Sequence, residues 1–274
     1  MPELPEVETV RLGLEHWARG TTIVKAQTFH PRATNPRSLA RISSLKGARI
    51  TRLSRRGKFL WFELDRPQAL VAHLGMSGQF RIQDPSIPAE KHLRAKLTLD
   101  TQKELRFIDQ RTFGWLAVSE MNGEVPDLVE AIAPDIFDPA FDAEAVVDRM
   151  RSKRTEIKRA LLDQNLMSGV GNIYADESLW LAKIHPQRSC DSLSRAKIKA
   201  LLSSVESVMS KALLEGGTSF DSLYTNINGE SGYFENSLEA YGRDGENCSR
   251  CDTQIRRIIV GGRSSHFCPR CQRL

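Results

Sequence analysis

The strongest constraint on the fold of this chain is a set of two cysteine pairs near its C-terminus. Cys248 and Cys251 form one Cys-x2-Cys pair, Cys268 and Cys271 form a second, and sixteen residues separate them. This spacing is typical of a tetrahedral zinc site in which each pair supplies two thiolates from one turn. Because protein ligands fill all four positions, we expect one structural zinc ion with no open position for a reacting water.

The zinc segment also holds the formal charge excess of the chain. Residues 248–274 contain six arginines and one acidic residue, so they contribute +5, which equals the net charge of the whole chain. Such a patch favours phosphate binding, because each contact with a nucleic acid backbone releases condensed counterions. A polyanionic partner is therefore expected, with a solvated basic tail as the alternative.

The spacer between the two cysteine pairs predicts a β-hairpin. Two strand-like runs flank Gly261 and Gly262, which places Arg263 at the hairpin tip, where it can be held out toward DNA. A redox role for the cysteine pairs is the alternative, and it is disfavoured because no thioredoxin-like βαβ pattern surrounds them. The fifth cysteine, Cys190, stands apart and is expected to be a structural thiol.

The first half of the chain changes from a helical to a β-strand pattern. Apolar residues at helical spacing predict a helix over residues 2–18, with acidic residues near its N-terminus, where the helix dipole favours them. From about residue 21 to residue 118 the pattern becomes short apolar and alternating runs, such as KFLWFEL and QFRI, separated by Gly, Pro and Asp. This region is expected to form a β-sandwich or barrel.

Helical spacing returns after a proline-rich stretch between residues 126 and 139. The expected helices are 142–151, 155–163, 172–183 and 193–215. Between the second and third of them, Gly169 and Gly171 indicate a tight turn, and Asn172 is placed to cap the following helix. This helix-turn-helix-like element suits a DNA backbone clamp, although an ordinary helical hairpin would have the same pattern.

These patterns together predict an α+β protein with several domains. We expect an N-terminal helix and β-sandwich over residues 1–130, a helical domain over 131–240 and a zinc finger over 241–274. No run of 18 apolar residues is present to span a bilayer, and the acidic start MPELPEVETV differs from a signal peptide. A soluble cytoplasmic protein without a membrane partner is the expectation.

The second residue is a candidate nucleophile. Removal of Met1 would leave Pro2 as a secondary amine, and α-amino groups titrate near pH ~8. Attack of this amine on a sugar C1′ would displace the base and form an iminium ion, which stays cationic and favours elimination of the flanking phosphates. Glu3 lies beside it and could transfer protons. Taken alone, the two residues would be interpreted as an ordinary helix start.

Four motifs in order show that the sequence resembles the bacterial formamidopyrimidine-DNA glycosylases, which repair 8-oxoguanine. These motifs are the opening PELPEVET, the internal HLGMSGQFRI, the turn GVGNIYADE and the zinc hairpin ending FCPRCQ. The resemblance spans the chain and implies a helix-two-turn-helix within the helical domain. It also implies a bifunctional enzyme of base-excision repair that removes 8-oxoguanine and formamidopyrimidines and cleaves the strand by β,δ-elimination. The implied partner is damaged double-stranded DNA, bound by a monomer in the bacterial cytoplasm, at the nucleoid, without a nucleotide cofactor.

The resemblance also assigns catalytic roles to four residues. Pro2 corresponds to the Schiff-base nucleophile and Glu3 to the catalytic acid. Lys58 is similar to a lysine that assists proton transfer during β-elimination, where an exposed lysine at a strand edge is the alternative interpretation. Arg263 corresponds to an arginine that binds the lesion phosphates and assists δ-elimination.

Further residues are implied to contact DNA. Those expected to grip phosphates are His92, Arg111, Arg154 and Asn172. A flipped nucleotide leaves a gap in the duplex, and the family fills it with residues matching Met76, Arg111 and Phe113. The segment 219–241 resembles a loop that closes over the lesion. Where the family commonly has Asp-Pro-Arg-Arg-Phe-Gly, this chain has DQRTFG, which keeps the contacting arginine and phenylalanine but changes the stiffness of the loop.

Two other functions fit parts of the sequence. An endonuclease VIII-like glycosylase for oxidised pyrimidines would share the architecture, but its opening typically has glycine where this chain has Leu4. A catalytically silent zinc protein that binds damaged DNA is the second alternative. The presence of all four candidate catalytic residues argues against it.

Overall fold

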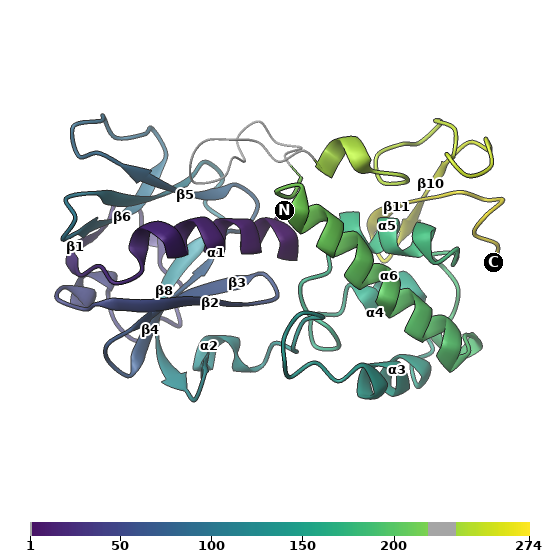
Figure 1. The fold of residues 1–274 in the computed structure, drawn as a ribbon, viewed down its shortest axis with the longest axis horizontal. Coiled ribbons are helices and arrows are strands. Elements are labelled where there is room, and N and C mark those ends of the chain that lie inside the picture. The colour runs from purple at the N-terminus through teal and green to yellow at the C-terminus, as the bar shows by residue number, and fades with distance from the viewer. Residues whose placement is uncertain (1, 219–233) are drawn as a thin grey trace. The chain divides into compact units, whose positions relative to one another are not determined.

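The computed structural model describes residues 2–218 and 234–274, which fall into two compact units (Figure 1). The first unit comprises residues 2–131 and also takes in residues 215–218. The second comprises residues 132–214 and 234–274. Within the described ranges, no helix is both long enough and apolar enough to cross a membrane.

The first unit contains a long helix, α1 (Leu4–Ala18), and two antiparallel sheets. The four-stranded sheet has the order β1 (Ile23–Thr28), β6 (Leu93–Leu99), β7 (Glu104–Asp109), β5 (Gly78–Gln83). The five-stranded sheet has the order β2 (Ile50–Arg56), β3 (Phe59–Leu64), β4 (Gln68–His73), β8 (Trp115–Asn122), β9 (Val125–Pro126). The short helices of this unit are η1 (Pro31–Ala33), η2 (Ile42–Leu45) and α2 (Asp127–Glu130).

The two sheets share one apolar core, which makes this unit a β-sandwich. Phe62 on β3 packs against Phe80 on β5 with ring centroids 5.9 Å apart, and Phe80 packs against Phe107 on β7 at 5.1 Å. Helix α1 contributes Val10 and Leu14 to the same core. Along β6, buried and partly exposed residues alternate because successive residues point to opposite faces, whereas the inner strands β4 and β7 are buried along most of their length. The predicted α+β class, with a helix and a β-sandwich, is confirmed.

Helix α1 begins two residues later than the sequence pattern predicts. Glu3 occupies the N-cap position and forms a capping box with Glu6, and Pro5 lies in the first turn. A capping box satisfies backbone N–H groups that the first helical turn leaves without partners. Pro2 therefore precedes the helix, and Glu3 is at its boundary.

The second unit is helical and ends in a β-hairpin. Its helices are α3 (Ala143–Arg151), α4 (Ile157–Leu161), α5 (Asn172–Leu181) and α6 (Arg195–Leu214), with short η3 (Cys190–Ser192) and η4 (Phe234–Ser237). Strands β10 (Arg256–Val260) and β11 (Arg263–Phe267) form the hairpin, and β11 packs against α5 (Figure 1). The four helices lie where the sequence spacing predicts them.

The turn before α5 differs from the prediction in one respect. Gly169 has φ +91°, a left-handed conformation that favours glycine, whereas Gly171 is extended at φ −125° and occupies the N-cap position. Asn172 is the first residue of α5, so the prediction that it caps the helix was wrong. Its side-chain amide instead donates a hydrogen bond to the backbone carbonyl of Ser264 on the hairpin, 3.0 Å away.

Candidate active site and zinc centre

The start of the chain is buried and held by one carboxylate. Pro2 is buried, and Glu3 and Glu6 are each 3% exposed. Glu6 accepts the backbone N–H of Glu3 at 2.8 Å through Oε2, and the N–H and hydroxyl of Thr218 at 2.9 and 3.0 Å through Oε1. A Cβ on Gly217 would lie 3.0 Å from this carboxylate, so the close approach favours glycine. Glu6 thereby fixes the backbone beside Pro2 and joins it to residues 217–218.

Lys58 is buried at the turn between β2 and β3. It follows Gly57, which has φ +57°, and only 6% of its surface is exposed. The alternative of an exposed strand-edge lysine therefore does not fit. Burial, together with the positive charge of Lys58, lowers the pKa of His73 to about 4. The positive charge of Lys58 therefore influences the neighbouring His73 side chain.

His73 connects Lys58 to the loop that carries Met76. Its ring contacts Phe59 at 4.9 Å and stacks on Trp115 at 5.8 Å between centroids. Its Nδ1 accepts the backbone N–H of Gly75 at 3.2 Å, so the ring nitrogen Nε2 carries the proton of the neutral imidazole. Sequence reasoning missed His73, although its position as the first residue of the HLGMSGQFRI motif was a signal.

The predicted gap-filling residues lie on two neighbouring loops of the first unit. Met76 lies between β4 and β5, whereas Arg111 and Phe113 lie between β7 and β8. Phe113 is 49% exposed, and the guanidinium of Arg111 lies 5.3 Å from its ring centroid. A Cβ on Gly75 would lie 2.4 Å from the carbonyl carbon of Phe113, so the two loop backbones touch. The fold thus brings the three residues together.

His92 lies beside the second of these loops. Its carbonyl accepts the backbone N–H of Asp109 at 3.0 Å, immediately before the loop that carries Arg111. Arg94 donates from Nε to the carbonyl of Asp109 at 2.7 Å, and its NH2 nitrogen lies 3.4 Å from Nδ1 of His92. Two of the expected phosphate contacts, His92 and Arg111, are therefore connected through Asp109.

The second unit holds Arg263 at the turn of its hairpin. Gly261 and Gly262 have φ +56° and +77°, the left-handed pair that a tight hairpin turn needs. Arg263 pairs with Val260 directly after the turn, and its side chain is exposed. The sequence prediction of an exposed arginine at this tip matches the structure.

A buried ion pair anchors the residue next to Arg263. Lys158 on α4 and Asp176 on α5 are fully buried, with Nζ 2.7 Å from Oδ1. Lys158 also donates to the carbonyl of Ser264 at 2.7 Å, the same oxygen that Asn172 binds. Asp176 further accepts the hydroxyl of Ser265 at 2.9 Å. The backbone at the hairpin tip is thus fixed by two helices.

The neighbouring acid, Glu177, anchors the chain that leads into the zinc hairpin. It accepts backbone N–H groups from Glu239, Ala240 and Tyr241 at 2.9, 2.9 and 2.7 Å. Burial raises the pKa of Glu177, and the three N–H donors oppose that shift. Asp176 and Glu177 belong to the GVGNIYADE motif, but the sequence alone assigned neither residue a role. Two adjacent acids in an otherwise apolar helix were the available signal, since buried charges need partners.

Arg154 has a different environment from Asn172 and Arg263. Its side chain is 92% exposed, and its guanidinium lies 3.9 Å from the carboxylate of Asp191. An exposed pair of this kind contributes little to stability. The Arg154 side chain is therefore accessible to an anionic ligand.

The four paired cysteines form a zinc site. Their Sγ atoms all lie within 4.8 Å of one another, with Cys251 3.4 Å from Cys268 and 3.5 Å from Cys271. Zinc–sulfur bonds of about 2.3 Å in a tetrahedron place the sulfurs about 3.8 Å apart, so the donor set fits one zinc ion. Such an ion joins the turn at Cys248 to the turn at Cys268 and holds the ends of the hairpin together.

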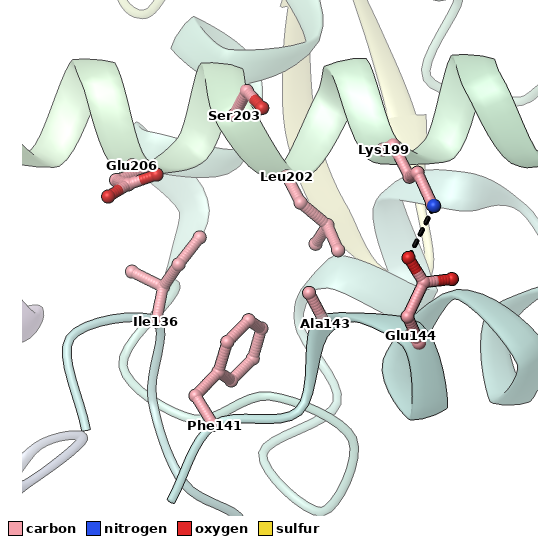
Figure 2. Close-up of a pocket in the computed structure, with 8 residues that line it drawn as sticks. All are labelled: Ile136, Phe141, Ala143, Glu144, Lys199, Leu202, Ser203 and Glu206. Carbon is pink, nitrogen blue, oxygen red and sulfur yellow. Dashed lines mark ion pairs between the residues drawn. The ribbon is translucent and has the colours of Figure 1, made fainter. Parts of the chain in front are cut away.

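The second unit also contains a cavity of about 290 Å³ between α3, α6 and the segment before α3 (Figure 2). Ile136 and Phe141 line its apolar side, and Lys199 pairs with Glu144 at one end. None of the candidate catalytic, DNA-contacting or zinc-binding residues lines this cavity.

Comparison with known proteins agrees with this arrangement. Residues 1–116 match the formamidopyrimidine-DNA glycosylase N-terminal domain, residues 132–223 match its H2TH domain, and residues 245–274 match a zinc finger found in FPG and IleRS. A formamidopyrimidine-DNA glycosylase of Streptomyces coelicolor is 54% identical, covering 100% of this chain and 98% of that protein. One from a Nocardioides species is 52% identical, covering 99% and 94%.

Solved structures show the same likeness. Lactococcus lactis Fpg in complex with an abasic site containing DNA has a TM-score of 0.91 and 37% identity, covering 99% of this chain and 100% of that one. A variant of that protein with a Fapy-dG containing DNA also has a TM-score of 0.91 and 37% identity, covering both chains completely.

The fold and the site define a DNA-repair glycosylase with a helix-two-turn-helix domain and a zinc finger. The full-length similarity then identifies the family without ambiguity. The chain belongs to the formamidopyrimidine-DNA glycosylase family, whose members act in base-excision repair.

Proposed function

We propose that this chain excises oxidised purines from double-stranded DNA through covalent catalysis by Pro2 and then cleaves the strand by β,δ-elimination. The observation that carries the proposal is the buried start of the chain, where Glu6 fixes the backbone at Glu3 directly beside Pro2. A nucleophile held in one geometry reacts faster than a mobile chain end. Similarity to Lactococcus lactis Fpg, whose complexes contain Fapy-dG or abasic DNA, supports the substrate class.

Base removal requires the Pro2 nitrogen to be a free amine, so Met1 must first be removed. The amine attacks C1′ of the damaged nucleotide, the bond from C1′ to the base breaks, and the base leaves with a proton. Glu3 is the proposed proton donor for sugar ring opening and base departure. The product has a C1′–N iminium bond to Pro2, which carries a positive charge because proline nitrogen has no further proton to lose.

Strand cleavage follows from that positive charge. The iminium withdraws electrons, so a proton leaves C2′ and the 3′ phosphate departs in β-elimination. A second elimination releases the 5′ phosphate, and water hydrolyses the remaining sugar fragment from Pro2. Lys58 is proposed to assist proton transfer in the first elimination, and Arg263 to bind the lesion phosphates and assist the second.

The proposal also assigns the DNA contacts and the parts of the chain. The residues proposed to bind phosphates are His92, Arg111, Arg154 and Asn172, while Met76 and Phe113 fill the gap left by the flipped nucleotide.

The three parts of the chain have separate proposed roles. Residues 1–130 act as the catalytic domain, 131–240 as the helical DNA-binding domain and 241–274 as the zinc finger. The proposed lesion-capping loop falls mostly on residues 219–233, outside the described residues. We further propose that the protein acts as a monomer, without a nucleotide cofactor, in the cytoplasm at the nucleoid.

Borohydride trapping tests the covalent step, because it reduces the iminium to a stable amine. Zinc-loaded protein whose N-terminus is verified as Pro2 should form a covalent adduct with duplex DNA containing 8-oxoguanine opposite cytosine. Protein that retains Met1 is the matched control and should form none, since its Pro2 nitrogen is an amide. Absence of an adduct with the Pro2-terminal protein, on both lesion-containing and abasic DNA, would contradict the proposal and favour a damaged-DNA-binding protein without catalysis.

A second variant separates the two halves of the reaction. Glu3→Gln should lose excision of 8-oxoguanine but keep adduct formation on DNA with a pre-formed abasic site, because an aldehyde needs no base departure. Equal loss on both substrates would contradict the role of Glu3 as proton donor. It would indicate instead that Glu3 maintains the structure of the N-terminus.

Oxidised pyrimidines are the competing substrate class. Another complex of Lactococcus lactis Fpg contains an oxidized pyrimidine containing DNA, and that structure has a TM-score of 0.89 and 36% identity to this chain. Single-turnover excision of 8-oxoguanine and thymine glycol from matched duplexes decides between the two classes. Faster release of thymine glycol would indicate that oxidised pyrimidines, and not oxidised purines, are the preferred substrates.

A further inference from the structure

The two loops that carry Met76, Arg111 and Phe113 share one buried carboxylate. Asp109 ends strand β7 and is 0% exposed. We propose that Asp109 is a positioning residue that joins these loops into one rigid wedge and thereby controls nucleotide flipping. The inference rests on the proposed function, because it concerns how the same enzyme reaches its substrate.

The carboxylate of Asp109 bonds both loops directly. Oδ1 accepts the hydroxyl of Ser77 at 2.6 Å, on the loop of Met76, and the backbone N–H of Arg111 at 3.1 Å. Oδ2 accepts the backbone N–H of Gly114 at 2.7 Å, at the far end of the second loop. A buried carboxylate loses its hydration, so hydrogen bonds to it are strong, and their removal leaves an unsatisfied charge.

Close backbone contact makes the two loops a single body. A Cβ on Gly75 would lie 2.4 Å from the carbonyl carbon of Phe113, and one on Gly114 would lie 2.8 Å from the carbonyl oxygen of Leu74. Neither loop can shift toward the other, and the hydrogen bonds of Asp109 keep them from separating. Phe113 therefore projects from a fixed support, although its own side chain is half exposed.

The same hydrogen bonds hold a strained turn. Thr112 has φ +52°, a left-handed conformation that a β-branched residue rarely adopts. The two backbone groups that Asp109 binds in this loop, at Arg111 and Gly114, lie on either side of Thr112. The DQRTFG sequence departs from the commoner family loop at this position, so the carboxylate stabilises a conformation that the local sequence disfavours.

Further bonds tie the wedge to the expected phosphate contacts. The backbone carbonyl of Asp109 accepts Nε of Arg94 at 2.7 Å, and its N–H donates to the carbonyl of His92 at 3.0 Å. A wedge that is rigid before DNA binds loses less conformational entropy when it enters the base stack. We therefore expect Asp109 to act on flipping and to have little effect on chemistry at an abasic sugar that is already extrahelical.

Asp109→Asn is the informative substitution, because it keeps the shape but replaces one acceptor oxygen with a donor. Single-turnover excision of 8-oxoguanine from duplex DNA should fall by about tenfold or more, given how steeply rates depend on ångström-scale placement. Cleavage of single-stranded DNA with a pre-formed abasic site, which requires no flipping, should stay within about twofold. Asp100→Asn, in an exposed turn between β6 and β7, is the control and should change neither rate.

Two further measurements keep the test decisive. Hydrogen exchange of the backbone amides of residues 111–114 in the free protein should speed up in Asp109→Asn, and this readout needs no activity. Ser77→Ala removes the hydrogen bond that Ser77 donates to Asp109 and the one it accepts from the backbone N–H of Arg111. Because it keeps the carboxylate, it should reduce duplex excision in the same direction but less. Unchanged exchange, or equal loss on the duplex and the single-stranded substrates, would overturn the positioning role. Failure of the unmodified protein to excise or to cleave would instead refute the proposed function.

Discussion

Replacing Lys158 with methionine tests the buried ion pair behind the hairpin tip. The substitution conserves much of the side-chain length but removes the ammonium group, which donates to Asp176 and to the carbonyl of Ser264, each at 2.7 Å. Both members of the pair are fully buried. Asp176 would then remain as a buried carboxylate without this cation. We expect a large loss of stability in the second unit.

The expected magnitude follows from the partners that Asp176 keeps. Removing one member of a buried ion pair typically costs about 3–5 kcal/mol, because the remaining charge is uncompensated. Asp176 retains the hydroxyl of Ser265 at 2.9 Å, the backbone N–H of His266 at 2.8 Å and the contact with Nδ1 of the His266 ring at 3.2 Å. These donors stabilise the lone carboxylate, so the loss should lie near the lower end, at about 3 kcal/mol.

Urea denaturation of the zinc-loaded protein, followed by intrinsic tryptophan fluorescence, to which Trp180 in the second unit contributes, measures this loss. The double variant Lys158→Met with Asp176→Asn should recover part of it, because the second change removes the uncompensated charge. The reasoning would be refuted by a loss below about 1 kcal/mol for Lys158→Met, or by losses that simply add in the double variant. Either result would mean that the remaining donors fully satisfy Asp176.

Two further predictions concern pH and zinc. Burial and Lys58 lower the pKa of His73 to about 4, whereas an unfolded histidine titrates near ~6.5, so the unfolded state binds more protons between these values. The contribution of His73 to the free energy of unfolding should be complete above about pH 6.5 and should decrease toward pH 4 by at most about 3 kcal/mol. The urea midpoint of His73→Phe should therefore depend less on pH than that of the unmodified protein. An unchanged pH dependence would contradict the low pKa of His73. A chelator should release one zinc per chain, read with a metallochromic dye, and should raise hydrogen exchange in residues 256–267 but not in β2–β8. Retained protection in the hairpin would show that the zinc ion does not hold it.

Local sequence was sufficient where short-range geometry decides the structure. The spacing of the four cysteines identified the zinc ligands, because two residues between cysteines bring both thiolates to one turn. Gly261 and Gly262 placed the hairpin turn, since both have the positive φ angles that glycine readily adopts. Short apolar and alternating runs separated by Gly, Pro and Asp predicted the β-sandwich, because strands are short and end where turn residues begin. The resemblance to the family, also legible in the sequence, agrees with full-length relatives that are more than 50% identical.

Tertiary structure decided which polar groups are buried and what holds them. Lys58 looks like an exposed strand-edge residue in sequence, yet only 6% of its surface is exposed in the folded chain. Asn172 looks like a helix cap, but it binds Ser264, 92 residues away. Lys158 bonds the same carbonyl from 106 residues away. Periodicity cannot reveal such partners, because a hydrogen bond depends on positions in space and local patterns report only which face of an element is apolar. The sequence therefore indicated which groups are candidates for catalysis and binding. The fold alone determined which of them are held in place, because it brings distant donors to buried carboxylates such as Asp109 and Asp176.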